Sequence, residues 1–186
     1  MSTLALAMAA GLAAAAAGAE KAPQPSLMVC LDPDGRAAVI DGGRAAASRV
    51  FQRAGIRLVW RDSQRPCLEG YGIVVTVALG TPYDQHRGAL AYALPYERTH
   101  IVLMYDRVLQ AVTRSAVPSL LGYTLAHEIG HMLEGVTRHS DSGVMKARWD
   151  YRDYADMQLW RLRFAQDDID MMLDNLSRNL RMAEGK

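Results

Sequence analysis

Charge of one sign, cysteine and long apolar runs are all scarce in this chain of 186 residues. The 21 lysines and arginines nearly balance the 20 aspartates and glutamates, so the formal net charge is only +1. The basic residues are scattered along the sequence and form no stripe or cluster. This pattern argues against nucleic-acid binding and against a polybasic membrane anchor. The length fits one domain that can bury a core of its own.

Long apolar runs are missing everywhere except at the beginning of the chain. Residues 1–19 are small and apolar, and Ala17-Gly18-Ala19 fits an A-x-A cleavage site. We therefore expect a signal peptide over 1–19 and a secreted or periplasmic domain over 20–186, with no stable membrane association after cleavage. Because no lysine or arginine precedes the apolar stretch, a poly-alanine helix and an uncleaved anchor are the alternatives. No other segment reaches the roughly 18 apolar residues of a transmembrane helix.

Cysteine occurs only as Cys30 and Cys67, and neither lies in a C-x-x-C arrangement. In an oxidising compartment such a pair is expected to form a disulfide. Closing a loop of this length would stabilise the fold by roughly 4 kcal/mol in the chain-entropy model. Two buried free thiols, or a thiolate that touches a metal, are the alternatives.

The apolar patterns of the first half predict strands around one helix. Short apolar or alternating runs predict strands at 27–31, 56–60, 72–80 and 100–105. The first run ends at the turn signal Asp32-Pro33-Asp34-Gly35. Residues 43–54 have apolar residues at helical spacing and stop at Gly55. Between 81 and 99, turn residues flank a short apolar centre, which we interpret as a loop leading into an edge strand.

The second half predicts helices. Pro118 and Ser119 open an apolar-periodic run, in which Ser119 suits an N-cap and Gly135 suits a stop. Residues 153–164 and 166–180 both show apolar spacing of three and four. The second of these runs has one stripe, formed by Ile169, Met172, Leu173, Leu176 and Leu180. The order of strand, helix, several strands and then helices predicts an α+β fold with a mixed, twisted sheet.

Three of the five histidines lie between positions 127 and 139. His127 and His131 are four apart on a predicted helix, so both rings project from one face and can reach one ion. Glu128 follows the first histidine, and H-E-x-x-H on a helix is the zinc-protease signature. A catalytic zinc takes three protein ligands. A rigid helix would carry His139 about 12 Å past His131, but Gly135 permits a sharp break that returns the chain to the metal.

The stretch HEIGHMLEGVTRH resembles the extended zinc-binding motif of the metzincins, in the longer form H-E-x-x-H-x-x-x-G-x-x-x-H. The following HSDSGVM resembles the path from the third ligand to the Met-turn in the matrixin branch. The resemblance implies a minimal metzincin-like catalytic domain with one catalytic zinc ion. It also implies that Glu128 is the general base and acid, and that Met145 forms the turn beneath the metal. The implied zinc ligands are His127, His131 and His139.

Aspartates are the alternatives to His139 as the third ligand. Asp141 lies close to His139, and a carboxylate can bind zinc. A more distant aspartate would resemble the aspzincin arrangement; the candidates are Asp150, Asp153 and Asp156. A glutamate on a later helix, as in thermolysin-like enzymes, is nearly excluded, because the next glutamate after Glu134 is Glu184.

Other histidines and tyrosines receive weaker interpretations. His86 and His100 lie outside the cluster and are interpreted as surface or strand residues. Tyr151 and Tyr154 follow the predicted Met-turn and are interpreted as packing residues that can also line a cleft.

The resemblance implies an exported zinc endopeptidase in which Glu128 takes a proton from the attacking water and delivers it to the leaving amine. In metzincins an edge strand above the helix binds the substrate by strand addition; residues 88–94 are the counterpart by resemblance. We expect a monomer with a peptide or protein substrate and no nucleic-acid partner. Two alternatives stay open: a catalytically inactive, zinc-stabilised secreted binding protein on the same fold, and hydrolysis of a non-peptide amide. Glu128 favours an enzyme, because structural zinc needs no base.

Overall fold

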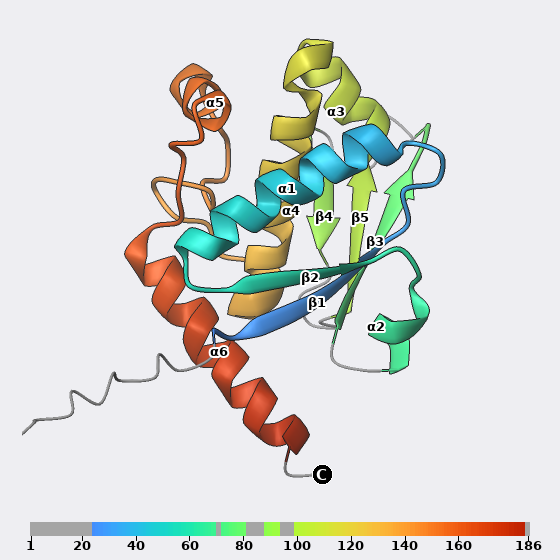
Figure 1. The fold of residues 1–186 in the computed structure, drawn as a ribbon. Helices are drawn as coiled ribbons and strands as arrows, with labels where there is room; N and C mark the ends of the chain where they lie inside the picture. The colour runs from blue at the N-terminus through green and yellow to red at the C-terminus, as the bar shows by residue number, and fades with distance from the viewer. Residues whose placement is uncertain (1–23, 70–71, 81–87, 94–98, 185–186) are drawn as a thin grey trace, which may run out of the picture.

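A five-stranded sheet forms the centre of the protein in the computed structural model, which describes residues 24–69, 72–80, 88–93 and 99–184 (Figure 1). Its strands are β1 (Ser26–Leu31), β2 (Arg57–Arg61), β3 (Gly72–Ala78), β4 (Ala91–Ala93) and β5 (His100–Met104). The spatial order is β2-β1-β3-β5-β4, with the first four parallel and β4 antiparallel to β5 at one edge. The predicted strands are confirmed, and the sheet is mixed as expected for an α+β fold. The proposed signal peptide lies outside the described residues.

Helices fill the connections between the strands and most of the chain after β5. They are α1 (Ala37–Arg53), α2 (Arg65–Glu69), α3 (Tyr105–Ala111), the 3-10 turn η1 (Arg114–Ala116), α4 (Val117–Glu134), α5 (Tyr151–Gln158) and α6 (Gln166–Glu184). In the described part of the chain, no helix is long and apolar enough to cross a membrane.

One face of the sheet packs against α1 and α4, which also pack against each other (Figure 1). Alternate residues of β1 (Leu27, Val29 and Leu31) point to this face and are fully buried, as strand geometry requires. The helix α1 begins at Ala37, well before the predicted start at 43. A Cβ on Gly43 would lie 1.8 Å from a Leu121 methyl group, so this glycine is needed for close helix packing and does not mark a helix start.

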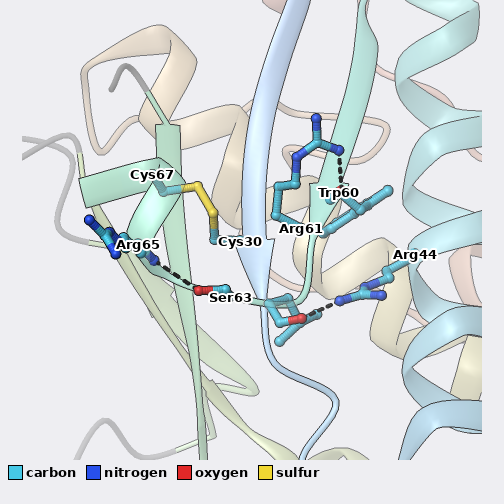
Figure 2. The surroundings of a disulfide bond; sticks show 8 residues. Cys30, Arg44, Trp60, Arg61, Ser63, Arg65 and Cys67 are labelled. Carbon is cyan, nitrogen blue, oxygen red and sulfur yellow. Dashed lines mark hydrogen bonds between the residues drawn. A yellow bond between two sulfur atoms is a disulfide. The ribbon is translucent and has the colours of Figure 1, made fainter. Parts of the chain in front are cut away.

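The opposite face carries a smaller cluster around the disulfide. Cys30 of β1 is bonded to Cys67 of α2, as Figure 2 shows, and both cysteines are buried beside Val74. The predicted pairing is therefore confirmed, and the structure leaves no free cysteine. The short α2 was not predicted, because it has too few residues to show a helical period.

Two further predicted helix boundaries are wrong. The helix α4 begins at Val117 with Pro118 in its first turn, so Ser119 lies inside the helix and is not its N-cap. Its hydroxyl donates instead to the Met157 carbonyl, 3.1 Å away. The helix predicted over 153–164 ends at Gln158, because Trp160 has a left-handed backbone with φ 58°.

The chain between α5 and α6 is irregular yet contributes to the core through Leu162 and Phe164, which belong to the run that predicted the longer helix. The predicted helix over 166–180 is confirmed as α6, which crosses the C-terminal end of α4 (Figure 1). Met172 and Leu176 are fully buried in its apolar stripe, and Ile169 and Leu173 pack beside them. The side chain of Leu180 lies outside the described residues. Tyr105 starts α3 and does not end β5.

Candidate metal centre and cleft

The helix α4 is buried along almost its whole length and holds the first two histidines of the site. The spacing of four residues places the rings of His127 and His131 on one face, with their Nε2 atoms 3.1 Å apart. The rings meet edge to face, with centroids 4.7 Å apart. Because the helix is packed against the core on several sides, its backbone cannot shift easily, and the two nitrogens keep this separation.

Backbone carbonyls hold the other nitrogen of each ring. His127 Nδ1 lies 2.8 Å from the Val144 oxygen, and His131 Nδ1 lies 3.2 Å from the Val136 oxygen. With a proton on Nδ1 donating to the carbonyl, each Nε2 keeps its lone pair for a metal ion. Burial lowers the pKa of His127 to about 4 and that of His131 to about 3, so both rings are neutral near pH 7.

His139 joins them from beyond the end of the helix. Gly135 ends α4 in the left-handed conformation, with φ 68°, and its amide donates to the His131 carbonyl. The chain then turns back, and ligand atoms of His127, His131 and His139 all lie within 4.8 Å of one another. The structure thus brings together the three predicted histidines, and the glycine has the predicted role.

The predicted alternatives to His139 lie elsewhere. Among the described residues, the group of side chains that could hold a metal ion consists of the three histidines and includes no carboxylate. Asp150 caps α5 and, together with Asp153, accepts hydrogen bonds of 2.7 Å from Lys146. His100 lies on β5, where its Nδ1 is 2.8 Å from the Thr99 hydroxyl, and it does not join the cluster. His86 is outside the described residues.

Glu128 is buried beside the histidines, with 8% of the residue exposed. Burial raises the pKa of its carboxyl group to about 7, while a hydrogen bond from the Ala93 backbone opposes the rise. Ala93 belongs to the edge strand β4, so this contact joins the acid on the helix to the edge of the sheet. A carboxyl group with such a pKa can both accept and donate a proton near neutral pH.

Met145 packs against α4 at Gly130, directly before His131 in the sequence. It is fully buried, and a Cβ built on Gly130 would lie only 2.4 Å from its Sδ atom. The preceding residue, Val144, supplies the carbonyl that holds His127. Trp149 donates to the same carbonyl over 3.2 Å, and its ring meets the His127 ring edge to face at 5.5 Å. Trp149 was not singled out from the sequence; its only signal was an aromatic residue shortly after the predicted Met-turn.

A cleft of about 680 Å³ opens in front of the site. One side is formed by residues 88–93, the floor by α4 and the other side by 146–149. The predicted strand at 88–94 therefore borders the cleft through β4, although residue 94 lies outside the described residues. Tyr154 lines the cleft, as the sequence allowed, whereas Tyr151 is 75% exposed and does not line it.

No model of a known protein family matches this chain, and no curated protein sequence matches it. The case for a function therefore comes from the site itself.

The donor set fits a metal ion. The imidazole rings of three histidines converge. In His127 and His131, the two on α4, a backbone carbonyl binds Nδ1, and burial keeps both rings neutral. Imidazole nitrogens suit zinc, copper, iron and nickel better than they suit magnesium or calcium. Three histidines can therefore hold a metal ion at this place.

A second glutamate on α4 lies outside the cleft. The side chain of Glu134 is completely buried and lies 3.6 Å from the Nε atom of Arg138. In its ionised form the carboxylate has no hydrogen-bond donor among the described residues, whereas the protonated form can donate to the Asp168 carboxylate. Burial raises the pKa of Glu134 to about 7; Arg138 opposes the rise and the nearby Asp168 carboxylate adds to it. No pattern in the sequence indicated a role for Glu134.

Proposed function

We propose that this protein is a zinc-dependent endopeptidase of the metzincin type that acts outside the cytoplasm. The observation that carries the proposal is the convergence of three histidines beside a buried glutamate, in a cleft bordered by an edge strand. A purely structural zinc site usually has four protein ligands and no adjacent acid. Here His127, His131 and His139 would hold the ion, and three protein ligands leave room for a reactant.

The role of Glu128 follows from its position beside the histidines and the edge strand. A bound zinc ion would supply Lewis acidity, which polarises a peptide carbonyl and makes a water molecule more acidic. Glu128 would accept a proton from the attacking water as the water oxygen bonds to the carbonyl carbon. It would then deliver that proton to the amide nitrogen as the carbon–nitrogen bond breaks.

The edge strand gives the substrate a place to lie. In the described part of the sheet, β4 pairs with β5 on one side and with no strand on the other. An extended peptide can add to such an edge through backbone hydrogen bonds. Because the Ala93 amide bonds to Glu128, a peptide along β4 would pass beside the acid. This arrangement supports a peptide or protein substrate.

The disulfide supports an oxidising location. Disulfides persist in secreted and periplasmic proteins and are rare in the cytosol. The bond between Cys30 and Cys67 is therefore in keeping with export.

The test compares zinc content and casein or gelatin cleavage for the wild type, Glu128→Gln and His139→Ala. We expect the wild type to hold one zinc and to cleave. Glu128→Gln should keep the metal and lose cleavage by about 10²- to 10⁴-fold, and His139→Ala should lose much of both. His100→Ala is the matched control, because His100 lies outside the cluster, and it should change neither.

A different pattern would favour the alternative of a zinc-stabilised binding protein. In that case the wild type would bind zinc and cleave nothing, including a library of peptides, and Glu128→Gln would change no measured property. A wild type that binds no zinc would overturn both proposals.

A further inference from the structure

The three histidines of the site are held to very different degrees. His127 and His131 sit on a packed helix, and a backbone carbonyl holds each ring. His139 is exposed and lies on irregular chain beyond Gly135, and its ring has no hydrogen bond among the described residues. Something other than the ring's own contacts must therefore keep His139 within reach of the other two.

Both neighbours of His139 are bound to one oxygen atom. Arg138 Nη2 lies 2.7 Å from Asp168 Oδ1, and the Ser140 hydroxyl donates to the same Oδ1 over 2.5 Å. Arg138 and Ser140 are also 3.3 Å apart through Nη1 and Oγ. Arg138, Ser140 and Asp168 thus all contact one another. These contacts hold the chain on both sides of His139.

Asp168 is itself firmly anchored. It is the third residue of α6, is completely buried, and accepts the Ala165 amide on its other oxygen, Oδ2, over 3.3 Å. A carboxylate in the first turn of a helix is favoured by the helix dipole, and one that accepts the amide at the helix start also caps it. A buried charge is stable only when paired, and Arg138 supplies the pairing.

Ser140 connects this anchor to the segment that contains Met145. Its amide donates to the Met145 carbonyl over 2.9 Å, and it forms a β-bridge with Lys146. The stretch with His139 is therefore fixed on one side to α6 and on the other to the segment that contains Met145. Neither anchor touches the metal-binding nitrogens.

We propose that Asp168 is a positioning residue for the metal site, which acts through Arg138 and Ser140 to hold His139 in reach of His127 and His131. The proposal rests on the metal site of the proposed function, but not on peptide cleavage. Residues that orient metal ligands typically change metal affinity by about 10- to 100-fold when they are substituted. Asp168 is separated from His139 by 29 positions, so no local sequence motif indicates that the two residues are linked.

The test is a double-mutant cycle on metal affinity. The full chain is stripped of metal and titrated with Zn²⁺ against a chromophoric chelator, as wild type, Asp168→Asn, His139→Ala and the double variant. Co²⁺ absorption spectra report the coordination of the same four proteins. We expect Asp168→Asn to weaken Zn²⁺ binding by about 10- to 100-fold and to alter the Co²⁺ spectrum. In the His139→Ala background the same substitution should weaken binding no further.

Two controls separate positioning from general damage. Asp174→Asn alters an exposed aspartate of the same helix, paired with Arg178, and should leave Zn²⁺ affinity unchanged. Ser140→Ala removes one contact to Asp168 without removing a buried charge, and should weaken binding by a smaller factor even if Asp168→Asn folds poorly. Circular dichroism and the melting temperature of the metal-free proteins identify variants that have lost the fold.

Several results would overturn the proposal. One is wild-type Zn²⁺ affinity in folded Asp168→Asn or, if that variant fails to fold, in Ser140→Ala. Another is an equal loss of affinity with and without His139, which would mean that Asp168 acts through its charge or through the fold as a whole. If the coupling is found but the wild type cleaves no peptide, the positioning role stands and the proposed peptidase function fails.

Discussion

The helix α4 buries two glutamates in two different surroundings. Glu128 faces the cleft and receives the Ala93 amide, whereas Glu134, near the end of the helix, faces Arg138 and does not line the cleft. The pKa of each is raised to about 7, with burial as the first cause. The comparison teaches that a raised pKa reports burial, and that only the position beside the histidines and the edge strand suggests catalysis for Glu128.

The largest expected effect separates the two residues by activity. Glu128→Gln should lower kcat/KM for a peptide substrate by about 10²- to 10⁴-fold, because glutamine cannot carry the proton. Glu134→Gln should lower kcat/KM far less, because its side chain does not line the cleft and can act on the site only indirectly, through Arg138 and Asp168. Steady-state kinetics on both variants provides the measurement. An equal loss of kcat/KM in both variants would show that the position of Glu128 beside the histidines gives it no special role in catalysis.

Removal of the disulfide should lower the stability of the fold and leave the metal site unchanged. Cys30 and Cys67 are separated by 37 positions, and cross-linking such a loop stabilises a fold by about 4 kcal/mol in the chain-entropy model. The double variant Cys30→Ser, Cys67→Ser should lose roughly 2–4 kcal/mol of unfolding free energy. Urea denaturation measures the loss. Zn²⁺ affinity should stay the same, because the bond lies on the sheet face opposite α4.

The buried carboxyl group of Glu134 should make the stability of the fold depend on pH. Its carboxyl group binds a proton more tightly in the folded protein than in the unfolded chain, where the pKa is about 4.5. Stability due to this group is therefore fully present below about pH 4.5 and is lost as the pH rises through about 7. Glu134→Gln should remove this loss and stabilise the protein by roughly 1–3 kcal/mol at pH 8. At pH 4 it should have almost no effect.

Denaturation of the metal-free protein at both pH values checks this expectation. Glu69→Gln, the same change at an exposed glutamate, is the control for a general response to charge. A Glu134→Gln variant that is less stable at pH 8 would mean that the ionised carboxylate is well paired with Arg138.

The smallest expected effect concerns a hydroxyl on the cleft side of α4. Thr124 is buried and lines the cleft, but its Oγ1 has no hydrogen-bond partner among the described residues. Thr124→Val keeps the shape and removes the unsatisfied group, so it should stabilise the metal-free protein by about 1 kcal/mol. Thr137→Val, at an exposed position of the same cleft, should be neutral. A destabilised Thr124→Val variant would show that the hydroxyl is hydrogen-bonded in solution.

The sequence revealed most of what depends on local geometry. The separation of His127 and His131 and the break at Gly135 follow from helix geometry and from glycine's freedom, so the three-histidine cluster could be predicted. The strands could be predicted because their apolar runs are short and are bounded by turns. The disulfide could be predicted because the chain has only two cysteines.

The parts that could not be predicted depend on tertiary contacts. Trp149 matters because it shares the Val144 carbonyl with His127, and Asp168 matters because α6 returns to the His139 loop. Ser119 carried the signal of an N-cap, but a hydrogen bond to Met157 occupies its hydroxyl. Leu162 and Phe164 extended an apolar pattern that predicted a helix, but their segment is irregular and tertiary packing alone turns both side chains inward.

The contact between Gly130 and Met145 limits how the sequence around the site can vary. In H-E-x-x-H the two central letters denote free choice, yet here Ile129 is fully buried and Gly130 has the Met145 sulfur where a side chain would begin. A library randomised at these two positions should therefore return mostly glycine at 130 and medium-sized apolar residues at 129. Any side chain at 130 would displace Met145. A substitution at this position, which the motif leaves unspecified, should therefore disturb the site.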